Sequence, residues 1–329
     1  MDINLERAFI SSSQENIRIN AIESIVEKGF GKESPITSIE TTKYGDVNSC
    51  YVITITNPMK KLFLKVENHD LIPQYYSGQI ERENASIELL KKHGFPCPTV
   101  ILCDITKADI GKKYILTEFV DGYLLSDIWV NLTSSEKKKA KEEIITLIRN
   151  LEEVKNPYFG DIYENGNRGK FEDWNDAYSN LTDILLKDCV NAGLFDNKEL
   201  ETVKSAIQKS CTKIKNNFHP CFNHMDIHSK NIIVDRAEDG IKLNAIIDFG
   251  NSMFGIPFTD EYRVCNYKFF KEDSFISEIP KKFIISKDEQ FSYELLFDLE
   301  CLVFEGMMKS NKVSNLKVLS KCRAYLITA

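Results

Sequence analysis

The sequence predicts an α+β protein in which a strand-rich N-terminal part is followed by a helix-rich C-terminal part. Alternating and short apolar runs, which are typical of strands, occupy about the first 120 of the 329 residues. Beyond them the apolar residues recur at helical spacing, and a turn signal at Asp121-Gly122 separates the two patterns. This segregation favours two lobes over a doubly wound sheet. We therefore expect an N-terminal lobe of residues 1–120 and a C-terminal lobe of residues 121–329.

Apolar spacing also places the individual elements. Tyr51, Ile53 and Ile55 alternate with smaller or polar residues, and Asn57-Pro58 marks a turn before the next apolar run. In the N-terminal part we expect a helix over 13–31, strands over 51–55 and 62–66, a helix over 79–92, and strands near 99–102 and 114–119. In the C-terminal part we expect helices over 136–154, 174–192, 198–216, 290–308 and 312–327.

Composition argues against several classes of function. The chain has 43% hydrophobic and 28% charged residues and a formal charge of −7, so no overall basic field favours nucleic acid as a partner. No apolar run approaches the roughly 18 residues of a membrane span, and the N-terminus lacks the pattern of a signal peptide. The nine cysteines are scattered without a Cys-x-x-Cys pair, which favours reduced thiols and a cytoplasmic location. The sequence leaves the oligomeric state open.

The most informative residues form two polar loops around an apolar hairpin. The first loop, residues 224–231, reads His-Met-Asp-Ile-His-Ser-Lys-Asn and contains Asp226 and Asn231. The second loop contains an Asp-Phe-Gly that begins at Asp248, and two apolar strands joined by a turn at 238–240 lie between the loops. Because an antiparallel pair brings its outer ends together, the three oxygen-bearing side chains should converge.

Convergent carboxylate and amide oxygens suit phosphoryl transfer. Magnesium prefers such oxygens and retains several waters. The attacking hydroxyl needs a nearby carboxylate to orient it and accept its proton. We therefore expect Asp226 to act as the base, and Asn231 and Asp248 to hold Mg²⁺. A lone Asp-Phe-Gly is a common turn signal, but its combination with His-x-Asp-x-x-x-x-Asn and an apolar hairpin is far more specific.

These loops resemble those of the aminoglycoside phosphotransferase and choline kinase-like family, a branch of the protein-kinase fold. In that family the first loop usually reads His-Gly-Asp-x-x-x-x-Asn and the second Ile-Asp-Phe/Trp-Gly/Glu. Here Met225 stands where the family most often has glycine. The resemblance implies a two-lobed protein-kinase-like fold. It also implies transfer of the terminal phosphoryl group of ATP or GTP to a small-molecule hydroxyl.

A lysine and a glutamate of the N-terminal part complete the expected site. Lys65 ends an apolar run, and burying a lysine costs several kcal/mol unless it is paired. Glu83 falls on the apolar stripe of Ile80, Ile87 and Leu90 in the following helix, so it is the better candidate for the partner. A surface lysine whose ammonium reaches into solvent is the alternative.

The resemblance also assigns nucleotide contacts in the N-terminal part. Asp46, Asn48 and Ser49 precede the first strand of the pair and would cover the phosphates, although an ordinary hairpin turn fits the same residues. The segment around Glu118 and Val120 resembles the family's inter-lobe hinge, whose backbone would meet the nucleobase. The side chain of Glu118 could equally face solvent.

The stretch Gly255-Ile256-Pro257-Phe258-Thr259-Asp260 resembles the family's Gly-Asp-Pro-x-x-Asp, with Ile256 in place of aspartate. The resemblance implies that Asp260 braces the first polar loop. About ten residues separate Asp248 from Asp260, which leaves no room for the long segment that protein kinases use to dock peptides. Small-molecule acceptors follow from that spacing.

The sequence leaves the acceptor open. Three hypotheses remain: a kinase of an aminoglycoside-type antibiotic that confers resistance, a metabolic kinase of choline, a sugar, a homoserine-like compound or a glycated amine, and a nucleotide-binding regulator without catalysis. The complete set of site residues speaks against the third. His224 is expected to be structural, and His228 is unassigned. Candidate walls of the acceptor pocket are Asp173, Trp174, Asp176, Asp298, Glu300 and Glu305, although acidic residues on helices are most often solvated and both tryptophans fit packing roles.

Overall fold

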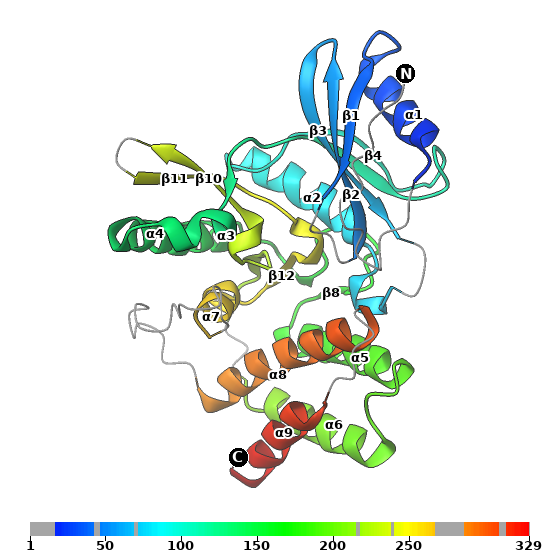
Figure 1. Ribbon diagram of the computed structural model, residues 1–329. Helices are drawn as coiled ribbons and strands as arrows, with labels where there is room; N and C mark the ends of the chain where they lie inside the picture. The colour runs from blue at the N-terminus through cyan, green and yellow to red at the C-terminus, as the bar shows by residue number, and fades with distance from the viewer. Residues whose placement is uncertain are drawn as a thin grey trace.

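The computed structural model describes residues 17–42, 47–68, 72–214, 218–237, 240–266, 286–308 and 314–328. It shows a β-sheet lobe above a larger, mainly helical lobe (Figure 1). The α+β prediction, with the sheet lobe preceding the helical lobe, is confirmed. We propose that the lobes divide at residue 120, since the strand of the upper sheet that ends at Glu118 is followed by Tyr123-Leu124, which pairs with the lower lobe.

The upper lobe is a five-stranded antiparallel sheet in the order β1-β2-β3-β5-β4. Its strands are β1 (Ile36–Thr41), β2 (Asn48–Thr56), β3 (Met59–Glu67), β4 (Val100–Asp104) and β5 (Tyr114–Glu118). One face packs on α1 (Ile19–Phe30), which buries Ile22, Ile25 and Val26 against it. Because side chains alternate along a strand, Leu64 of β3 faces this core whereas Lys65 faces the opposite side.

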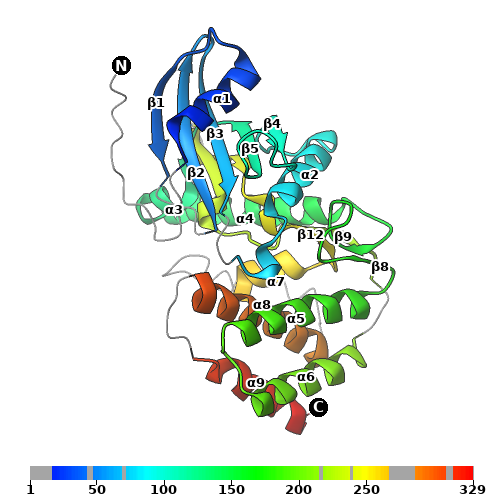
Figure 2. The same ribbon diagram turned by 90° about the vertical axis from the view of Figure 1, so that its right-hand side faces the viewer.

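Helix α2 (Gln79–Lys92) joins the sheet to the lower lobe. Its residues Ile80, Ile87 and Leu90 belong to a second core. They share this core with the long helix α4 (Ser134–Glu152) and with the hairpin of β10 (Ile232–Ala237) and β11 (Gly240–Ile246). In Figure 2 the helix lies between the sheet and the elements below it. The side chains of α2 can therefore contact both lobes.

The lower lobe combines small sheets with a layer of helices. Its strands are β6 (Tyr123–Leu124), β7 (Phe159–Gly160), β8 (Lys170–Phe171), β9 (Cys221–Asn223), β10 (Ile232–Ala237), β11 (Gly240–Ile246) and β12 (Met253–Gly255). Its helices are α3 (Leu125–Ile128), α4 (Ser134–Glu152), α5 (Trp174–Asn191), α6 (Asn197–Cys211), α7 (Thr259–Asn266), α8 (Lys287–Val303) and α9 (Leu316–Thr328). Helices α5, α6, α8 and α9 pack together at the base (Figure 2).

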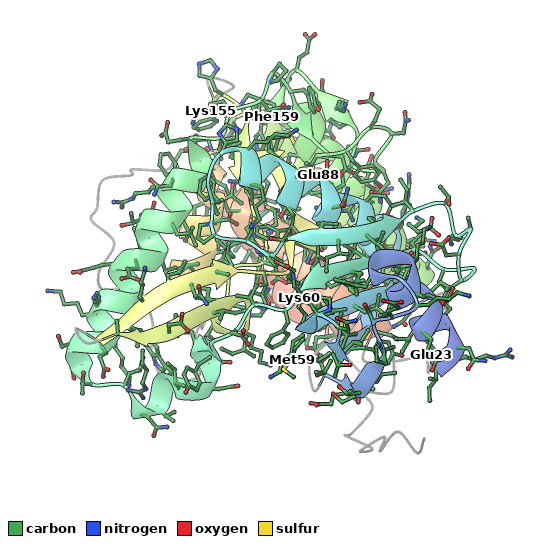
Figure 3. All side chains as sticks on the ribbon, turned by 90° about the horizontal axis from the view of Figure 1, so that it is seen from above. Glu23, Met59, Lys60, Glu88, Lys155 and Phe159 are labelled. Atoms are coloured by element: carbon green, nitrogen blue, oxygen red, sulfur yellow. The ribbon has the colours of Figure 1, made fainter. Side chains whose placement is uncertain are left out.

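The β10–β11 hairpin lies along α4, as the view from above shows (Figure 3). The N–H of Leu243 on β11 donates to Glu143 Oε2 on α4 at 2.8 Å. Strand β6 adds to the other edge of the hairpin, giving the order β11-β10-β6. The hairpin is thus held on both sides, which fixes the loops at its end.

Most expected elements form within a few residues of their predicted bounds. The helix expected over 290–308 is different, because α8 ends at Val303 and continues as a π-helical turn over Phe304–Met308. Residues 13–16, 215–216 and 312–313 of three expected helices lie outside the described residues, as does most of the turn expected at 238–240. Trp129 and Trp174 are buried as packing residues, and the eight cysteines whose side chains are described carry free thiols. Within the described ranges, no helix has both the length and the apolar character needed to cross a membrane.

The face of β3 that packs on α1 should carry much of the stability of the upper lobe. Leu64 is fully buried, so Leu64→Ala should lower the free energy of unfolding by about 2–5 kcal/mol through the lost apolar contacts and the cavity left behind. Denaturant unfolding measures this change. The exposed Lys61 of the same strand is the control: Lys61→Ala should change stability by less than about 1 kcal/mol, and an equal loss in both variants would contradict the packing argument.

Candidate active site

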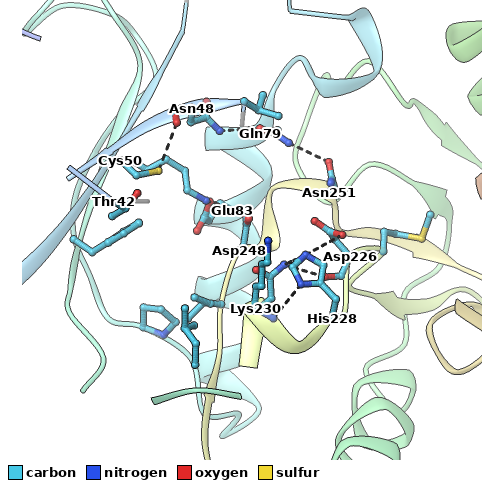
Figure 4. A pocket seen from close by; sticks show the side chains of 18 of the residues that line it. Thr42, Asn48, Cys50, Gln79, Glu83, Asp226, His228, Lys230, Asp248 and Asn251 are labelled. Carbon is cyan, nitrogen blue, oxygen red and sulfur yellow. Dashed lines mark hydrogen bonds and ion pairs between the residues drawn. The ribbon is translucent and has the colours of Figure 1, made fainter. Parts of the chain in front are cut away.

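The hairpin brings the predicted oxygen-bearing residues to one place. Ile232 of β10 lies opposite Ile246 of β11, so the residues just outside the pair are neighbours. The N–H of Ile247 donates to the carbonyl of Asn231 at 3.0 Å. The Asn231 amide in turn donates to the carbonyl of Asp226 at 2.9 Å. Figure 4 shows Asp226 and Asp248 close together at the edge of the pocket.

Asp260, at the start of α7, holds the loop that carries Asp226. Its Oδ2 accepts a hydrogen bond from the N–H of His224 at 2.6 Å, and its Oδ1 accepts one from the N–H of Met225 at 2.8 Å. Burial raises the pKa of Asp260 to about 6, although both N–H groups and the Arg263 guanidinium oppose the rise. The carboxylate thus satisfies two buried amides, which fits the bracing role that the family resemblance implies.

His224 is a structural part of the same loop. Its Nδ1 accepts a hydrogen bond from the N–H of Asp226 at 3.2 Å, so its Nε2–H donates to the carbonyl of Ile247 at 3.0 Å. The ring is fully buried and packs on Phe249, with 4.9 Å between the ring centroids. Burial lowers the pKa of His224 to about 4, so the ring is neutral near pH 7.

Two residues of the loops have left-handed backbone conformations. Met225 has φ +68° and Asp248 has φ +67°, a region that L-residues seldom adopt. The family's usual glycine at the position of Met225 would adopt this conformation without a steric penalty. Met225 is instead held by its neighbours: its N–H donates to Asp260, and its carbonyl accepts from Arg263 Nη1 at 2.6 Å.

Lys65 joins the two lobes through a buried ion-pair network. Its ammonium pairs with Glu83 of α2 and lies 2.9 Å from Asp248 Oδ1. Burial by itself would lower the pKa of Lys65, but Asp248 and Glu83 outweigh it and raise that pKa. Burial would likewise raise the pKa of Asp248, yet the Lys65 ammonium makes the net shift downward. Lys65 is only 5% exposed, so the surface alternative does not hold.

The expected phosphate-covering residues differ in where they lie. Asn48 lines the pocket and donates from Nδ2 to Gln79 Oε1 at 2.8 Å (Figure 4). Ser49 is buried and donates to Asn68 Oδ1 at 2.7 Å, and its side chain is not among those that line the pocket. Asp46 lies outside the described residues.

The expected hinge borders the pocket. Glu118 and Val120 both line it. The side chain of Glu118 accepts a bond from Lys60 at 2.6 Å at the half-exposed rim, and the N–H of Glu118 donates to Thr99 at 2.9 Å. The Glu118 carboxylate thus faces solvent, which was one of the two alternatives given for this side chain.

A cavity of about 750 Å³ lies between the lobes. Of the predicted site residues, its lining includes Asn48, Lys65, Glu83, Glu118, Val120, Asp226, Asn231 and Asp248. An apolar part of its wall is formed by Val52, Phe63, Pro98, Ile233 and Ile247. Beyond Asp226 its wall is formed by Tyr75, Tyr76, Arg263, Phe297, Glu300 and Phe304. Of the acidic residues weighed as acceptor walls, Glu300 alone is among the described lining residues. Asp298 instead pairs with Lys317 and Lys321. Asp173 caps the N-terminus of α5.

The sequence did not single out several residues of this site. His228 Nε2 lies 3.6 Å from Asp226 Oδ1 and 3.3 Å from Asn231 Nδ2, and Lys230 lines the same cavity (Figure 4). Tyr75 and Tyr76 come from the connection between β3 and α2, which carries no motif. Among these four residues, only His228 had a signal in the sequence, namely its position within the first polar loop.

The residues fit a magnesium ion held jointly with a nucleotide. The Asn231 amide nitrogen is used internally, and no described residue donates to its Oδ1. The side chain of Asp248 is 45% exposed toward the cavity. Groups of three or more His, Cys, Asp or Glu side chains suited to a metal ion are absent from the described ranges. Mg²⁺ commonly takes one or two protein ligands and completes its shell with phosphate oxygens and water, which this pair allows.

Comparisons with known proteins agree with this geometry. Residues 46–280 match the model of the phosphotransferase enzyme family. Among solved structures, the fold is similar to a thermostable mutant of aminoglycoside phosphotransferase APH(4)-Ia, with TM-score 0.65 and 14% identity over 93% of this chain and 98% of that chain. It is also similar to a putative fructosamine-3-kinase from Haemophilus somnus 129PT, with TM-score 0.64 and 16% identity over 93% and 97%. No curated protein matches the sequence.

The chain belongs to the phosphotransferase enzyme family, because the family model covers well over half of it. Its two-lobed fold is protein-kinase-like, as the sequence predicted. The protein is thus an enzyme of the phosphotransferase class.

The buried neutral His224 should make stability depend on pH. The unfolded chain binds a proton at this residue below pH 6.5, whereas the folded chain does so only near pH 4. The contribution of His224 to the free energy of unfolding should therefore fall as the pH drops through this window, by about 2 kcal/mol between neutral pH and pH 5. Denaturant unfolding of the wild type and His224→Gln at both pH values measures the difference.

The variant should lack this part of the pH dependence. His93 is exposed, so His93→Gln should keep the full wild-type dependence. An unchanged pH dependence in His224→Gln would show that the buried imidazole is not the responsible group.

Proposed function

We propose that the protein transfers the terminal phosphoryl group of an ATP-type nucleotide to a hydroxyl of a small molecule. The observation that carries this proposal is the convergence of Lys65, Asp226, Asn231 and Asp248 on one cavity from both lobes. A structural neighbour solved with AMP-PNP and hygromycin B supports a nucleoside triphosphate as donor. The experiment below compares ATP and GTP as donors.

The residues divide the reaction among themselves. The acceptor oxygen forms a bond to the γ-phosphorus, the bond from that phosphorus to the β,γ-bridging oxygen breaks, and the acceptor proton passes to Asp226. The carboxylate suits a base, because burial raises the pKa of Asp226 while His228 opposes the rise. Lys65, fixed by Glu83, would contact the nucleotide phosphates. Asn231 and Asp248 would hold Mg²⁺, which neutralises charge on the phosphates when bound.

Two acceptor classes merit direct comparison. Similarity to an aminoglycoside phosphotransferase favours a hydroxylated antibiotic and hence a role in resistance. A nearly equal TM-score to a putative fructosamine-3-kinase favours a glycated amine or a related metabolite. The free thiols of the described cysteines fit the cytoplasmic location that we propose for either activity.

Turnover should depend on Asp226. Asp226→Asn keeps the size of the side chain but cannot accept the proton, so turnover should fall about a hundredfold or more while ATP binding changes little. The measurement is release of nucleoside diphosphate with Mg²⁺ and ATP or GTP, in the presence of pooled aminoglycosides, other hydroxylated antibiotics, choline, sugars or fructosamines.

Acceptor-stimulated release that disappears in Asp226→Asn would support the proposal and identify the acceptor class. Full turnover by Asp226→Asn would refute the assignment of the base. Nucleotide binding without stimulated release by any pool would favour the regulatory alternative.

Nucleotide affinity should depend on Asp248 instead. Asp248→Ala removes a proposed metal ligand, so the Kd for Mg-ATP should rise about tenfold or more. Calorimetric titration with Mg-ATP, and with ATP in EDTA, separates the metal from the nucleotide. The effect should be confined to Mg-ATP, and an equal loss with ATP in EDTA would argue against metal binding by Asp248.

A further inference from the structure

The residue before the proposed base is held in an unfavourable backbone conformation. Met225 has φ +68°, although its side chain makes this region costly. The side chain is buried in the core of the lower lobe and is only 2% exposed. The peptide that leaves Met225 leads directly to Asp226. Its orientation therefore sets the direction in which the Asp226 carboxylate points.

Two side chains of α7 hold this conformation from both sides. The N–H of Met225 donates to Asp260 Oδ1 at 2.8 Å. Its carbonyl accepts from Arg263 Nη1 at 2.6 Å. Asp260 also accepts a hydrogen bond from the N–H of His224, so both of its bonds lie before the Met225–Asp226 peptide. Arg263 instead donates to the Met225 carbonyl, which belongs to that peptide. Of the two, Arg263 thus acts on the peptide next to Asp226.

Arg263 is itself fixed by a buried acceptor. Its Nη2 donates to Glu300 Oε1 on α8 at 2.7 Å, and the hydroxyl of Tyr75 donates to the same oxygen at 2.6 Å. Asp188 of α5 accepts the N–H of Tyr75 at 2.9 Å, and the Arg168 guanidinium lies 4.3 Å from the Tyr75 ring centroid. None of Tyr75, Arg263 and Glu300 is more than 8% exposed.

This arrangement changes the interpretation of Glu300. As an acidic residue lining the cavity, it was a candidate to meet a cationic group of the acceptor. Its Oε1 already accepts two short hydrogen bonds, one of them from a guanidinium. A carboxylate paired in this way is largely neutralised, so its first role is to orient Arg263.

We infer that Arg263 is a positioning residue for Asp226. It holds the Met225 carbonyl and so keeps this residue in the left-handed conformation that directs the base into the cavity. Glu300 and Tyr75 fix the Arg263 guanidinium. The guanidinium thereby connects α8 and the segment between β3 and α2 to the loop of residues 224–231. The inference rests on the proposed function, in which Asp226 is the base.

Glycine at position 225 provides the decisive test, because glycine adopts positive φ without the steric penalty. Arg263→Lys keeps the charge opposite Glu300 but lacks the planar fork that reaches both partners. In the wild-type background it should lower kcat about fivefold to thirtyfold, the factor that corresponds to releasing one left-handed residue. The KM for ATP should change by less than about twofold, because Arg263 acts on the base and not on the nucleotide.

In a Met225→Gly background the same substitution should lower kcat less than about threefold, since the loop no longer needs to be held. The four proteins are the wild type, Arg263→Lys, Met225→Gly and the double variant. Their kcat is measured as release of nucleoside diphosphate with Mg-ATP, using the most active acceptor pool, or water alone where no pool stimulates release. Arg149→Lys is the matched control: Arg149 of α4 also bonds to α7, through Glu261 at 2.9 Å, and no described hydrogen bond or ion pair joins its side chain to residues 224–231. It should leave kcat unchanged.

Equal losses of kcat from Arg263→Lys in both backgrounds would overturn the inference, as would no loss in the wild type. Thermal unfolding checks each variant. If Arg263→Lys does not fold, Glu300→Gln replaces it, and its loss of kcat should likewise shrink in the Met225→Gly background. Asp226→Asn in the same assay keeps the two proposals separate. Full turnover by that variant refutes the proposed base, whereas an inactive Asp226→Asn with a fully active Arg263→Lys refutes the positioning role alone.

Discussion

The pairing of one buried lysine with two carboxylates is the constraint on which the site depends. Lys65 comes from β3, Glu83 from α2 and Asp248 from the loop after β11, so three separate elements must meet at one ammonium group. Leaving Lys65 or Glu83 buried without a partner would cost several kcal/mol. The ion pairs therefore fix the position of α2 against the sheet. They also fix the loop after β11 against the upper lobe.

Helix α2 extends this constraint through polar groups on either side of Glu83. Gln79 connects Asn48 of β2 with Asn251, which follows the Asp-Phe-Gly turn. Arg82 is fully buried and donates to the carbonyl of Gly250 at 2.8 Å, within that turn. Burial and the nearby Arg168 guanidinium lower the pKa of Arg82 to about 10, which still leaves it charged near pH 7. One helix thus orients Asn48 of the proposed phosphate-covering segment, the lysine partner Glu83 and the proposed metal loop together.

Sequence reasoning was most successful where a local pattern determined the geometry. The two apolar strands around residues 238–239 were enough to predict that Asp226, Asn231 and Asp248 meet, and the cost of burying Lys65 pointed to Glu83. It could not find the contact between Tyr75 and Glu300, because these residues lie 225 positions apart and neither belongs to a motif. It also weighed Glu300, among other acidic residues on helices, as a candidate wall of the acceptor pocket. Only the folded chain shows that Arg263 and Tyr75 occupy its Oε1.

The two halves of the cavity are built from different elements. This difference explains why the fold points to phosphoryl transfer but does not identify the acceptor. The half around Lys65, Asn231 and Asp248 is fixed by the hairpin and the ion pairs. The other half depends on α8 and the π-helical turn after it, where Phe304 meets Tyr76 with 6.1 Å between ring centroids. The halves are joined through Glu300, which lines the acceptor side and also holds Arg263. In the proposed mechanism, a change at Glu300 that suited a new acceptor would also release the guanidinium behind Met225 and so alter the orientation of the proposed base.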